Sequence, residues 1–264
     1  MAAQIDLKNQ TLTDTHTHIY YHAGTPKLAE QMQRCFDQGI TRLFLPNVDI
    51  DSMEKVFETV DAYPSNCFPM LGLHPCDVKE DFQEVLATIR QRIDTAKIYA
   101  IGEIGIDLYW DKSTLAWQQE AFRQQIRWAK EMGLPISIHC REAFDEVFEV
   151  LESEKDERLF GIFHCFTGNL EQAHRAINLG FMLGIGGVLT FKKAGLDAVV
   201  KEIELKHIVL ETDAPYLAPV PFRGKENESS YLYYVAEKLA DIHEMAIDKI
   251  AEITTENSKL IFKI

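Results

Sequence analysis

The sequence predicts an α/β protein whose strands close into a (β/α)8 barrel, the TIM-barrel fold. Three observations lead to this fold class. About eight apolar runs of strand length recur along the chain, helical patterns separate them, and polar side chains that commonly bind metals follow several of the runs. With 264 residues and 46% hydrophobic positions the chain can build one large core, so we expect a single domain over residues 1–264.

The strand-like runs alternate with segments long enough to form a helix, as in repeated βα units. The predicted strands cover residues 12–16, 43–46, 68–73, 98–103, 136–139, 159–164, 181–185 and 208–212. Eight parallel strands are the number needed for a closed barrel with an outer ring of helices.

The helices between the strands are marked by their ends. Residues 26–38 stop at Gly39, and residues 113–132 stop at Gly133, as helices commonly end at glycine. Asn169, with Gln172 three positions later, predicts a capping box that opens a helix ending at Gly180. Residues 229–243 and 246–262 predict two further helices that complete the ring. Within the helix at 113–132, apolar residues at helical spacing predict a buried stripe, formed by Leu115, Phe122, Ile126, Ala129 and Met132.

The composition excludes some classes of protein. A net charge of −14 argues against a protein that coats nucleic acid by bulk electrostatics, although an enzyme with bound cations could still act on phosphates. The five cysteines have no paired spacing, so we expect no disulfide framework and a cytoplasmic location. The N-terminus shows no signal-peptide pattern and no apolar run reaches the length of a membrane span, so we expect a soluble protein without a membrane partner.

A His-x-His pair, His16 and His18, follows the first predicted strand. Residues two apart on an extended chain point to the same side, so both rings can reach one metal ion. Taken alone, the pair could equally be two unrelated histidines. Later strand ends supply more metal-binding side chains, namely Glu103, His139, His164 and Asp213.

Strand ends converge on one face of a barrel, so these six residues predict a site for two metal ions. Imidazole and carboxylate ligands suit several divalent cations, and a carboxylate can bridge two of them. Glu103 is the expected bridge. Any of the histidines alone could be an ordinary core residue, but burying six titratable groups together without a shared purpose would be costly.

Three neighbours of the predicted ligands have competing interpretations. Strand alternation turns Cys140 and Cys165 away from the site, so we expect them to pack rather than to bind metal. The same alternation puts Glu211 on the side of Asp213, where it either orients a ligand histidine or forms a buried ion pair.

Eight motifs, in order along nearly the whole chain, resemble those of the TatD family of metal-dependent hydrolases. They are Asp14-Thr-His-Thr-His18, Gly72-Leu-His-Pro75, Ala100-Ile-Gly-Glu103-Ile-Gly105, Ile138-His-Cys-Arg141, His164-Cys-Phe-Thr-Gly168, Leu210-Glu-Thr-Asp-Ala-Pro-Tyr-Leu-Ala-Pro219, Arg223-Gly-Lys225 and Thr254-Thr-Glu-Asn257.

The resemblance implies an amidohydrolase-type TIM barrel with two divalent cations, such as Mg, Mn or Zn, that hydrolyses phosphodiesters, typically as a DNase with exonuclease activity. It implies that His16, His18 and Asp213 hold one cation, that His139 and His164 hold the second, and that Glu103 bridges them. DNA is then the expected partner, as substrate, and no obligate protein partner is evident.

The sequence departs from the family pattern at several positions. Tyr20 stands where an acidic residue is common, and Leu108 where an aromatic residue is common. After Lys225 the chain reads Glu226, Asn227, Glu228 and Ser229, where the family usually has a basic residue followed by Asn-Glu-Pro. None of these departures removes a predicted metal ligand.

Other residues are candidates for substrate contact. Asp213 is the expected group to align or deprotonate the attacking water. Arg141 would offer a fork to phosphate or pair with Glu142, and His74 would contact phosphate, protonate a leaving oxygen or structure its loop. Arg223 and Lys225 are expected to position phosphates. Four aromatic residues near the same rim either stack on bases or anchor loops, namely Tyr109, Trp110, Tyr216 and Phe222.

Two other functions remain open from the sequence. The first is an esterase or amidase at the same centre, including one that deacylates aminoacyl-tRNA. Many such sites bridge their metals with a carbamylated lysine, and Glu103 at the fourth strand favours the phosphodiester reaction instead. The second is a metal-stabilised scaffold without turnover, which would be expected to fill its coordination with protein ligands and exclude water.

Overall fold

The computed structural model describes residues 11–264. The start of the chain, where the sequence predicts no signal peptide, lies outside the described residues. The strands are β1 (Leu12–Asp14), β2 (Ile40–Pro46), β3 (Cys67–Leu71), β4 (Ala100–Asp107), β5 (Ile136–Arg141), β6 (Gly161–Phe163), β7 (Phe181–Ile185) and β8 (Ile208–Leu210). The α-helices are α1 (Pro26–Asp37), α2 (Ile50–Ala62), α3 (Phe82–Ile93), α4 (Leu115–Met132), α5 (Phe144–Ser153), α6 (Leu170–Asn178), α7 (Leu196–Lys201), α8 (Leu232–His243) and α9 (Ile247–Phe262). Short 3-10 helices cover Ile19–His22, Pro75–Asp77, Gly187–Thr190, Leu205–His207 and Ser229–Tyr231.

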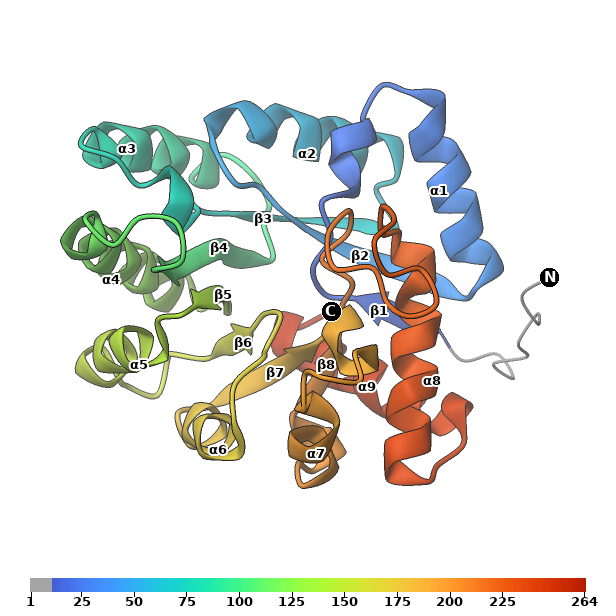
Figure 1. The fold of residues 1–264 in the computed structure, drawn as a ribbon. Coiled ribbons are helices and arrows are strands. Elements are labelled where there is room, and N and C mark those ends of the chain that lie inside the picture. Colours follow the sequence, from blue (N-terminus) through green and yellow to red (C-terminus); the bar gives the residue numbers. More distant parts are fainter. Residues whose placement is uncertain (1–10) are drawn as a thin grey trace.

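The eight strands form one parallel sheet in the order β1 to β8, with each strand paired to the next in sequence. The two edges of this sheet, β1 and β8, are joined by backbone hydrogen bonds that close the barrel. Thr15 N donates to Leu210 O at 3.0 Å, and Asp213 N donates to His16 O at 2.9 Å. Helices surround the strands in Figure 1. The predicted (β/α)8 barrel is confirmed.

Local sequence signals account for several helix ends. Pro26 opens α1, Gly133 ends α4 with a φ of 65°, and Asn169 and Gln172 form the predicted capping box with two hydrogen bonds of 2.9 Å. Within residues 11–264 no helix combines the length and the apolar character that crossing a bilayer requires.

The buried stripe of α4 is shorter than predicted. Phe122, Ile126 and Ala129 are buried, Leu115 is half-buried, and Met132 is 37% exposed. Met132 is the last residue of the helix, directly before Gly133, where few side chains remain to cover it.

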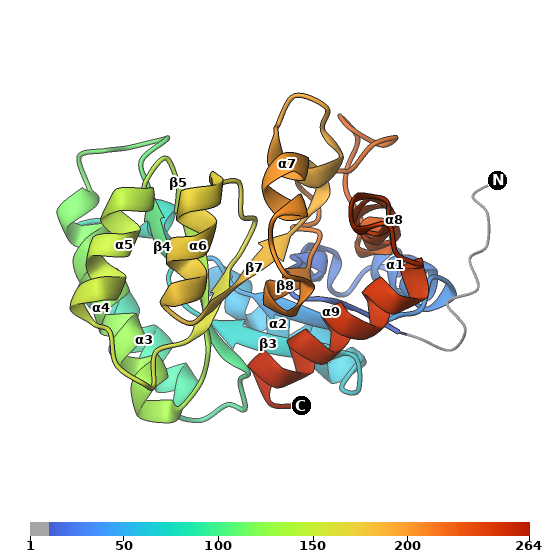
Figure 2. The same ribbon diagram turned by 90° about the horizontal axis from the view of Figure 1, so that it is seen from below.

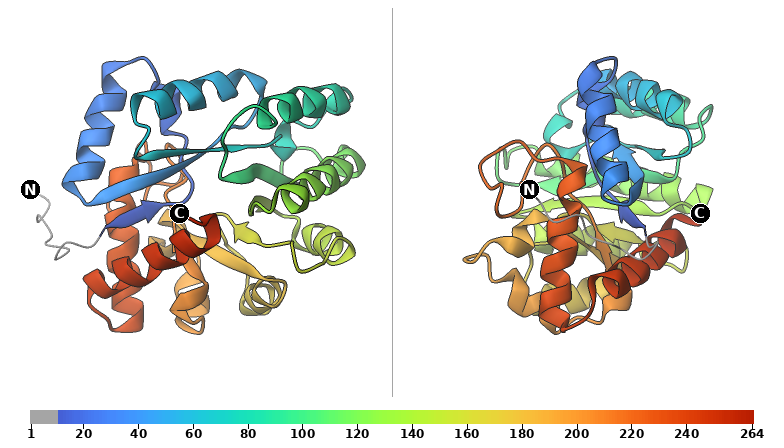
Figure 3. Two further views of the ribbon diagram at one scale, coloured as in Figure 1. Left: turned by 180° about the vertical axis from the view of Figure 1, so that it is seen from behind. Right: turned by 90° about the vertical axis from the view of Figure 1, so that its right-hand side faces the viewer.

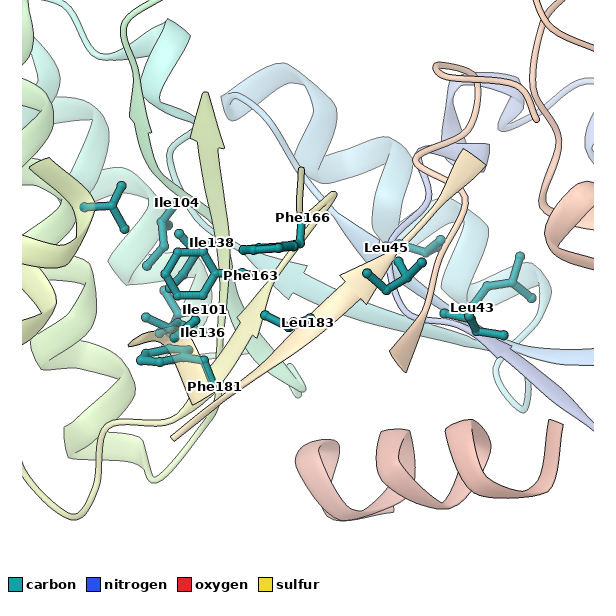
Figure 4. Packing of buried hydrophobic residues seen from close by; sticks show 14 of the residues in the cluster. Leu43, Leu45, Ile101, Ile104, Ile136, Ile138, Phe163, Phe166, Phe181 and Leu183 are labelled. Atoms are coloured by element: carbon teal, nitrogen blue, oxygen red, sulfur yellow. The ribbon is translucent and has the colours of Figure 1, made fainter. Parts of the chain in front are cut away.

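Alternation along the strands separates the core from the interior of the barrel. Ile136 and Ile138 of β5 pack with Phe163 of β6 on the side of the helices, as Figure 4 shows. The residues between them, Ser137 and His139, therefore face the interior. This alternation provides the polar lining on which the site is built.

Helix α9 closes the N-terminal end of the barrel. It packs on β1 and β8 and runs across the strands in Figures 2 and 3. The ring of Phe262 stacks on that of Phe44, with centroids 3.6 Å apart, in a second apolar cluster that includes Met70 and Val209. The bottom of the barrel is therefore sealed by side chains.

Replacing Phe262 by alanine should lower the free energy of unfolding by about 3 to 5 kcal/mol, because it leaves a cavity against Phe44. Urea unfolding measures the loss. Leu260 on the same helix is 73% exposed, so Leu260→Ala should change stability by less than about 0.5 kcal/mol. Equal losses for the two variants would show that α9 does not seal the barrel.

Candidate metal centre

His16 and His18 follow β1 and are held by the closure of the barrel. The buried Asp14 carboxylate accepts a hydrogen bond from His16 N at 3.3 Å and two from Thr212, at 3.0 Å from its N–H and 2.6 Å from its hydroxyl. Burial raises the pKa of Asp14 to about 7, although these hydrogen bonds oppose the shift. His18 N donates to Ala214 O at 2.7 Å. The pair is thus fixed between the ends of β1 and β8.

Glu103 lies between two groups of histidines. Its Oε2 is 3.2 Å from His16 Nε2 and 3.8 Å from His18 Nε2. Its Oε1 is 2.8 Å from His139 Nδ1 and 3.1 Å from His164 Nε2. One oxygen therefore faces each group, which is the arrangement expected of a bridging carboxylate.

The prediction that Glu103 ends the fourth strand is wrong. Pairing with β5 continues through Gly105 and His139 to Asp107 and Arg141, so Glu103 lies within β4. The register shifts between Ile101 and Ile104, on either side of Glu103. The carboxylate still points into the barrel with the histidines.

Asp213 completes the group around His16 and His18. Its Oδ1 is 3.4 Å from His18 Nε2 and 3.8 Å from His16 Nε2. β8 ends at Leu210, and Asp213 follows with a φ of 57°, so its direction comes from the turn and not from strand alternation. Its side chain is 15% exposed, compared with 3% for Glu103. It is the more accessible of the two carboxylates.

Two of the imidazoles each contact a buried carboxylate through the ring nitrogen that does not face Glu103. His164 Nδ1 donates to Glu211 Oε1 at 3.1 Å, and His139 Nε2 donates to Asp107 Oδ2 at 2.8 Å. This places Glu211 in the orienting position that the sequence left open. A histidine that donates one ring proton to a carboxylate has its other nitrogen turned toward the centre, as metal-binding histidines commonly do.

The other two imidazoles have hydroxyl partners. His16 Nδ1 lies 3.2 Å from Ser137 Oγ, and His18 Nδ1 lies 2.9 Å from the hydroxyl of Tyr20, which is fully buried. Tyr20 thus supplies a hydrogen-bonding oxygen at the position where the TatD pattern commonly has an acid.

The nitrogen and oxygen atoms of the cluster are of the kinds that bind metal ions in proteins. His16 Nε2 is buried and makes no hydrogen bond within the described residues, although Glu103 Oε2 is only 3.2 Å away. An imidazole nitrogen and a carboxylate oxygen that approach without a proton between them suit a shared cation. Three overlapping groups could hold a metal ion, namely His16 with Glu103 and His164, His16 with His18 and Asp213, and His74 with Glu103 and His139.

The electrostatics favour ionised carboxylates. Burial would raise the pKa of Glu103, but His74, His164 and His16 lower it far below its usual range. Burial opposes ionisation of Asp213 as well, and the hydrogen bond from His18 with the nearby imidazoles lowers its pKa. The two carboxylates of the centre are therefore anionic in the absence of a cation.

The histidines of the centre shift in opposite directions. Burial lowers the pKa of His16. Burial also acts to lower the pKa of His164, but Glu103 and Glu211 overcome this effect and raise it well above its usual value.

His74 belongs to the same cluster. Its Nδ1 accepts a hydrogen bond from Cys76 N at 3.1 Å, and its Nε2 lies 3.4 Å from Glu103 Oε1 and 3.3 Å from His139 Nδ1. The side chain thus structures its loop with one nitrogen and faces the centre with the other. Because Nδ1 is an acceptor, Nε2 carries the proton.

The three predicted cationic side chains are exposed and lie against aromatic rings. The guanidinium of Arg141 lies 3.7 Å above the ring of Tyr109, and among the described residues Arg141 forms no ion pair with Glu142. Arg223 lies 4.4 Å above Phe191 and Lys225 lies 5.8 Å from the Phe222 ring.

The four aromatic residues near the rim divide into two kinds. Phe222 stacks on Tyr231 at 4.1 Å and anchors its loop. Trp110, Tyr216 and Tyr109 are 71%, 51% and 49% exposed.

Cys140 and Cys165 supply no sulfur to these groups. Cys140 packs against the hydrophobic core, as predicted. β6 ends at Phe163 and Cys165 has a φ of 46°, so strand alternation does not govern its direction.

The remaining departures from the family pattern have structural partners. Glu226 accepts hydrogen bonds from Lys27 at 2.7 and 2.8 Å, and Leu108 is buried. Ser229 Oγ lies 2.9 Å from the hydroxyl of Thr17, the residue between His16 and His18 in the sequence. The contacts of Glu226 and Ser229 tie the loop after β8 to α1 and to the segment after β1.

The sequence reasoning missed the partners Asp107, Ser137 and Tyr20. Strand alternation could have found the first two, since Asp107 is four residues from Glu103 and Ser137 two from His139. A hydroxyl partner for His18 has no comparable signal.

A (β/α)8 barrel with a carboxylate between two groups of histidines at the C-terminal ends of its strands has the architecture of a metal-dependent hydrolase. The profile of the family described as TatD related DNase matches residues 13–263. The chain belongs to this family.

Individual members of the family are similar to this chain in sequence and in structure. The uncharacterized metal-dependent hydrolase YabD of Bacillus subtilis is 41% identical over 254 residues, which cover 96% of this chain and 99% of that protein. The 3'-5' ssDNA/RNA exonuclease TatD of Yersinia pseudotuberculosis is 30% identical over 239 residues, covering 88% and 92%. The crystal structure of YjjV, a TatD homolog from Escherichia coli, superposes with a TM-score of 0.89 at 27% identity, covering 96% and 98%.

Proposed function

We propose that this metal-dependent hydrolase cleaves phosphodiester bonds of nucleic acid, DNA in the first place, as an exonuclease that uses two divalent cations. The observation that carries the proposal is the division of the Glu103 oxygens between two groups of imidazoles. The Yersinia relative that is named an exonuclease supports the choice of substrate.

Each residue has a proposed role. His16, His18 and Asp213 would hold one cation, His139 and His164 would hold the other, and Glu103 would contact both. The chemistry that such cations would supply is a lower pKa of a bound water molecule and stabilisation of charge on phosphate oxygens. Glu211 keeps His164 turned toward the centre.

Two side chains move or supply protons in this proposal. Asp213 directs Oδ1 toward the histidines, so its Oδ2 is the group to accept the proton of the attacking water. His74 presents the N–H of Nε2 to the centre and donates it to a phosphate or leaving oxygen. Arg141, Arg223 and Lys225 contact phosphates further from the scissile bond.

An ester or amide substrate, for example an aminoacyl-tRNA, is the alternative at the same centre. The test strips the protein with a chelator, restores Mg, Mn or Zn singly, and compares end-labelled DNA, end-labelled RNA, an aminoacyl ester and a small phosphodiester. The proposal expects release of nucleotides from one end of DNA with at least one metal. Turnover of the aminoacyl ester alone would support the alternative.

Replacing Arg223 and Lys225 together by alanine should weaken hydrolysis of DNA more than that of a small phosphodiester, because only a strand reaches the rim. Loss of two phosphate contacts should make the slope of log K against the logarithm of the salt concentration shallower by an amount equivalent to about two charges. Steady-state assays on both substrates at several salt concentrations measure the difference. Equal losses on the two substrates would exclude a role in strand positioning.

Replacing Tyr20 by phenylalanine should lower metal affinity by about 10- to 100-fold, because it removes the oxygen that orients His18. Competition with a chelating dye measures the affinity. Tyr20→Asp restores an acceptor of the kind common in the family and should recover part of it. Unchanged affinity in Tyr20→Phe would mean that the phenol only fills space.

The five cysteines are free, which suits the cytoplasmic location that we propose. We also propose that residues 1–264 act as one domain and need no protein partner for this reaction.

A further inference from the structure

The loop after β4 exposes two large aromatic side chains. Trp110 is 71% exposed and Tyr109 is 49% exposed, and their rings meet edge to face with centroids 4.8 Å apart. Leu108, immediately before them, is buried. The loop is therefore anchored by an apolar residue while it leaves most of the Trp110 ring in solvent.

Arg141 adds a positive charge to the same place. Its guanidinium lies 3.7 Å above the Tyr109 ring and 5.6 Å from the Trp110 ring. The two segments are joined by a hydrogen bond of 3.0 Å from Leu108 N to Arg141 O. Aromatic rings beside an arginine are the combination that binds a base through its π face and its phosphate through charge.

Asp107 connects this aromatic platform, formed by Tyr109, Trp110 and Arg141, to the metal centre. Its Oδ1 accepts hydrogen bonds from Tyr109 N at 2.9 Å and Trp110 N at 3.4 Å, while its Oδ2 binds the His139 ring. Gln118 of α4 holds the Asp107 backbone with hydrogen bonds of 2.8 and 3.1 Å. One buried carboxylate thus fixes both the platform and a histidine of the centre.

Cations lie on the opposite side of the barrel mouth. Lys192 and Lys193 follow β7, and Arg223 and Lys225 follow β8, and all four are exposed. The ring of Phe191 beneath Arg223 joins these two loops. In an eight-stranded barrel β4 and β8 lie across from each other, so the metal centre separates the cations from the platform.

We propose that the platform is a base-stacking subsite for single-stranded nucleic acid, which holds the base of the nucleotide next to the scissile phosphate. This inference rests on the proposed nuclease function. The strand then crosses the metal centre and leaves along the four cations. A single strand is required because bases within a duplex already stack on one another and do not offer a free π face to Trp110.

Fluorescence of Trp110 tests the subsite directly. The chain has three tryptophans, so the double variant Trp117→Phe/Trp128→Phe retains Trp110 as the only reporter. The probe is a metal-loaded complex with a phosphorothioate single strand that resists cleavage. The matched control is an abasic strand with the same number of linkages.

Stacking should quench Trp110 with the base-carrying strand only, and that strand should bind about 10-fold more tightly than the abasic one. Trp110→Ala, made in the wild-type chain, should remove this 10-fold difference and leave abasic binding unchanged. Trp117→Ala, on α4 and 41% exposed, should retain the difference.

Equal affinity for the two strands, equal weakening of both by Trp110→Ala, equal quenching by a blunt duplex, or no binding at all would overturn the proposal. The subsite and the nuclease function fail in different ways. Base-dependent quenching without hydrolysis contradicts the function alone, and DNA hydrolysis with base-independent binding contradicts the subsite alone.

Discussion

Replacing Glu103 by alanine is expected to reduce metal-dependent hydrolysis by about 10³-fold or more, since the proposed bridging ligand would support both cations, whose effects are worth several kcal/mol. The side chain is 3% exposed and contacts histidines of both groups through different oxygens. Among residues 11–264 no other carboxylate of the centre does so. Steady-state hydrolysis of the small phosphodiester measures the loss without interference from strand binding.

A control separates loss of the centre from loss of the fold. Glu154 is 11% exposed, pairs with Arg127 and Lys130, and belongs to none of the groups of residues that could hold a metal ion. Glu154→Ala should retain activity, and circular dichroism should show a folded barrel for both variants. Activity of Glu103→Ala within about tenfold of wild type, which is only 1.4 kcal/mol, would exclude the bridging role.

Removing the metals is expected to have the second largest effect. A cation at a concentration 1,000-fold above its Kd stabilises the folded state by about 4 kcal/mol. Stripped protein should therefore unfold at a lower urea concentration and regain the difference when Mn or Zn is added. The same addition should stabilise Glu103→Ala much less.

The pH dependence of metal binding follows from His164. Glu103 and Glu211 raise its pKa well above the usual value, so in the metal-free protein the imidazole holds a proton that a cation must displace. Metal affinity should therefore increase with pH through this raised pKa. Calorimetry in buffers of different ionisation enthalpy should detect the released proton. Affinity that does not change with pH would contradict this account.

The sequence predicted the order of strands and the ring of helices because these depend on local patterns. Apolar runs of strand length mark β1 to β8, and the capping box at Asn169 marks the start of α6. Exact ends were less predictable. β4 runs on to Asp107 because its pairing with β5 continues, and no single-strand pattern reveals how far two strands pair.

The six predicted ligands converge in the structure because they lie on the inner side of β4 and β5 or follow β1, β6 and β8 at the same face of the barrel. The groups that orient them depend on register between distant segments. Ser137 reaches His16 across 121 positions of sequence, and Glu211 reaches His164 across 47. For Arg141 the sequence left a phosphate contact and a pair with Glu142 open, and it did not reveal that the guanidinium lies 3.7 Å above the exposed ring of Tyr109.

The central claim is that Glu103 joins two cations in one centre. Electron paramagnetic resonance of protein loaded with Mn²⁺ tests it most directly, because ions about 3.5 to 4 Å apart at a shared carboxylate are magnetically coupled. We predict two Mn²⁺ per chain with a coupled spectrum that Glu103→Ala abolishes. A single Mn²⁺ per chain, or two that give an uncoupled spectrum, would contradict the claim.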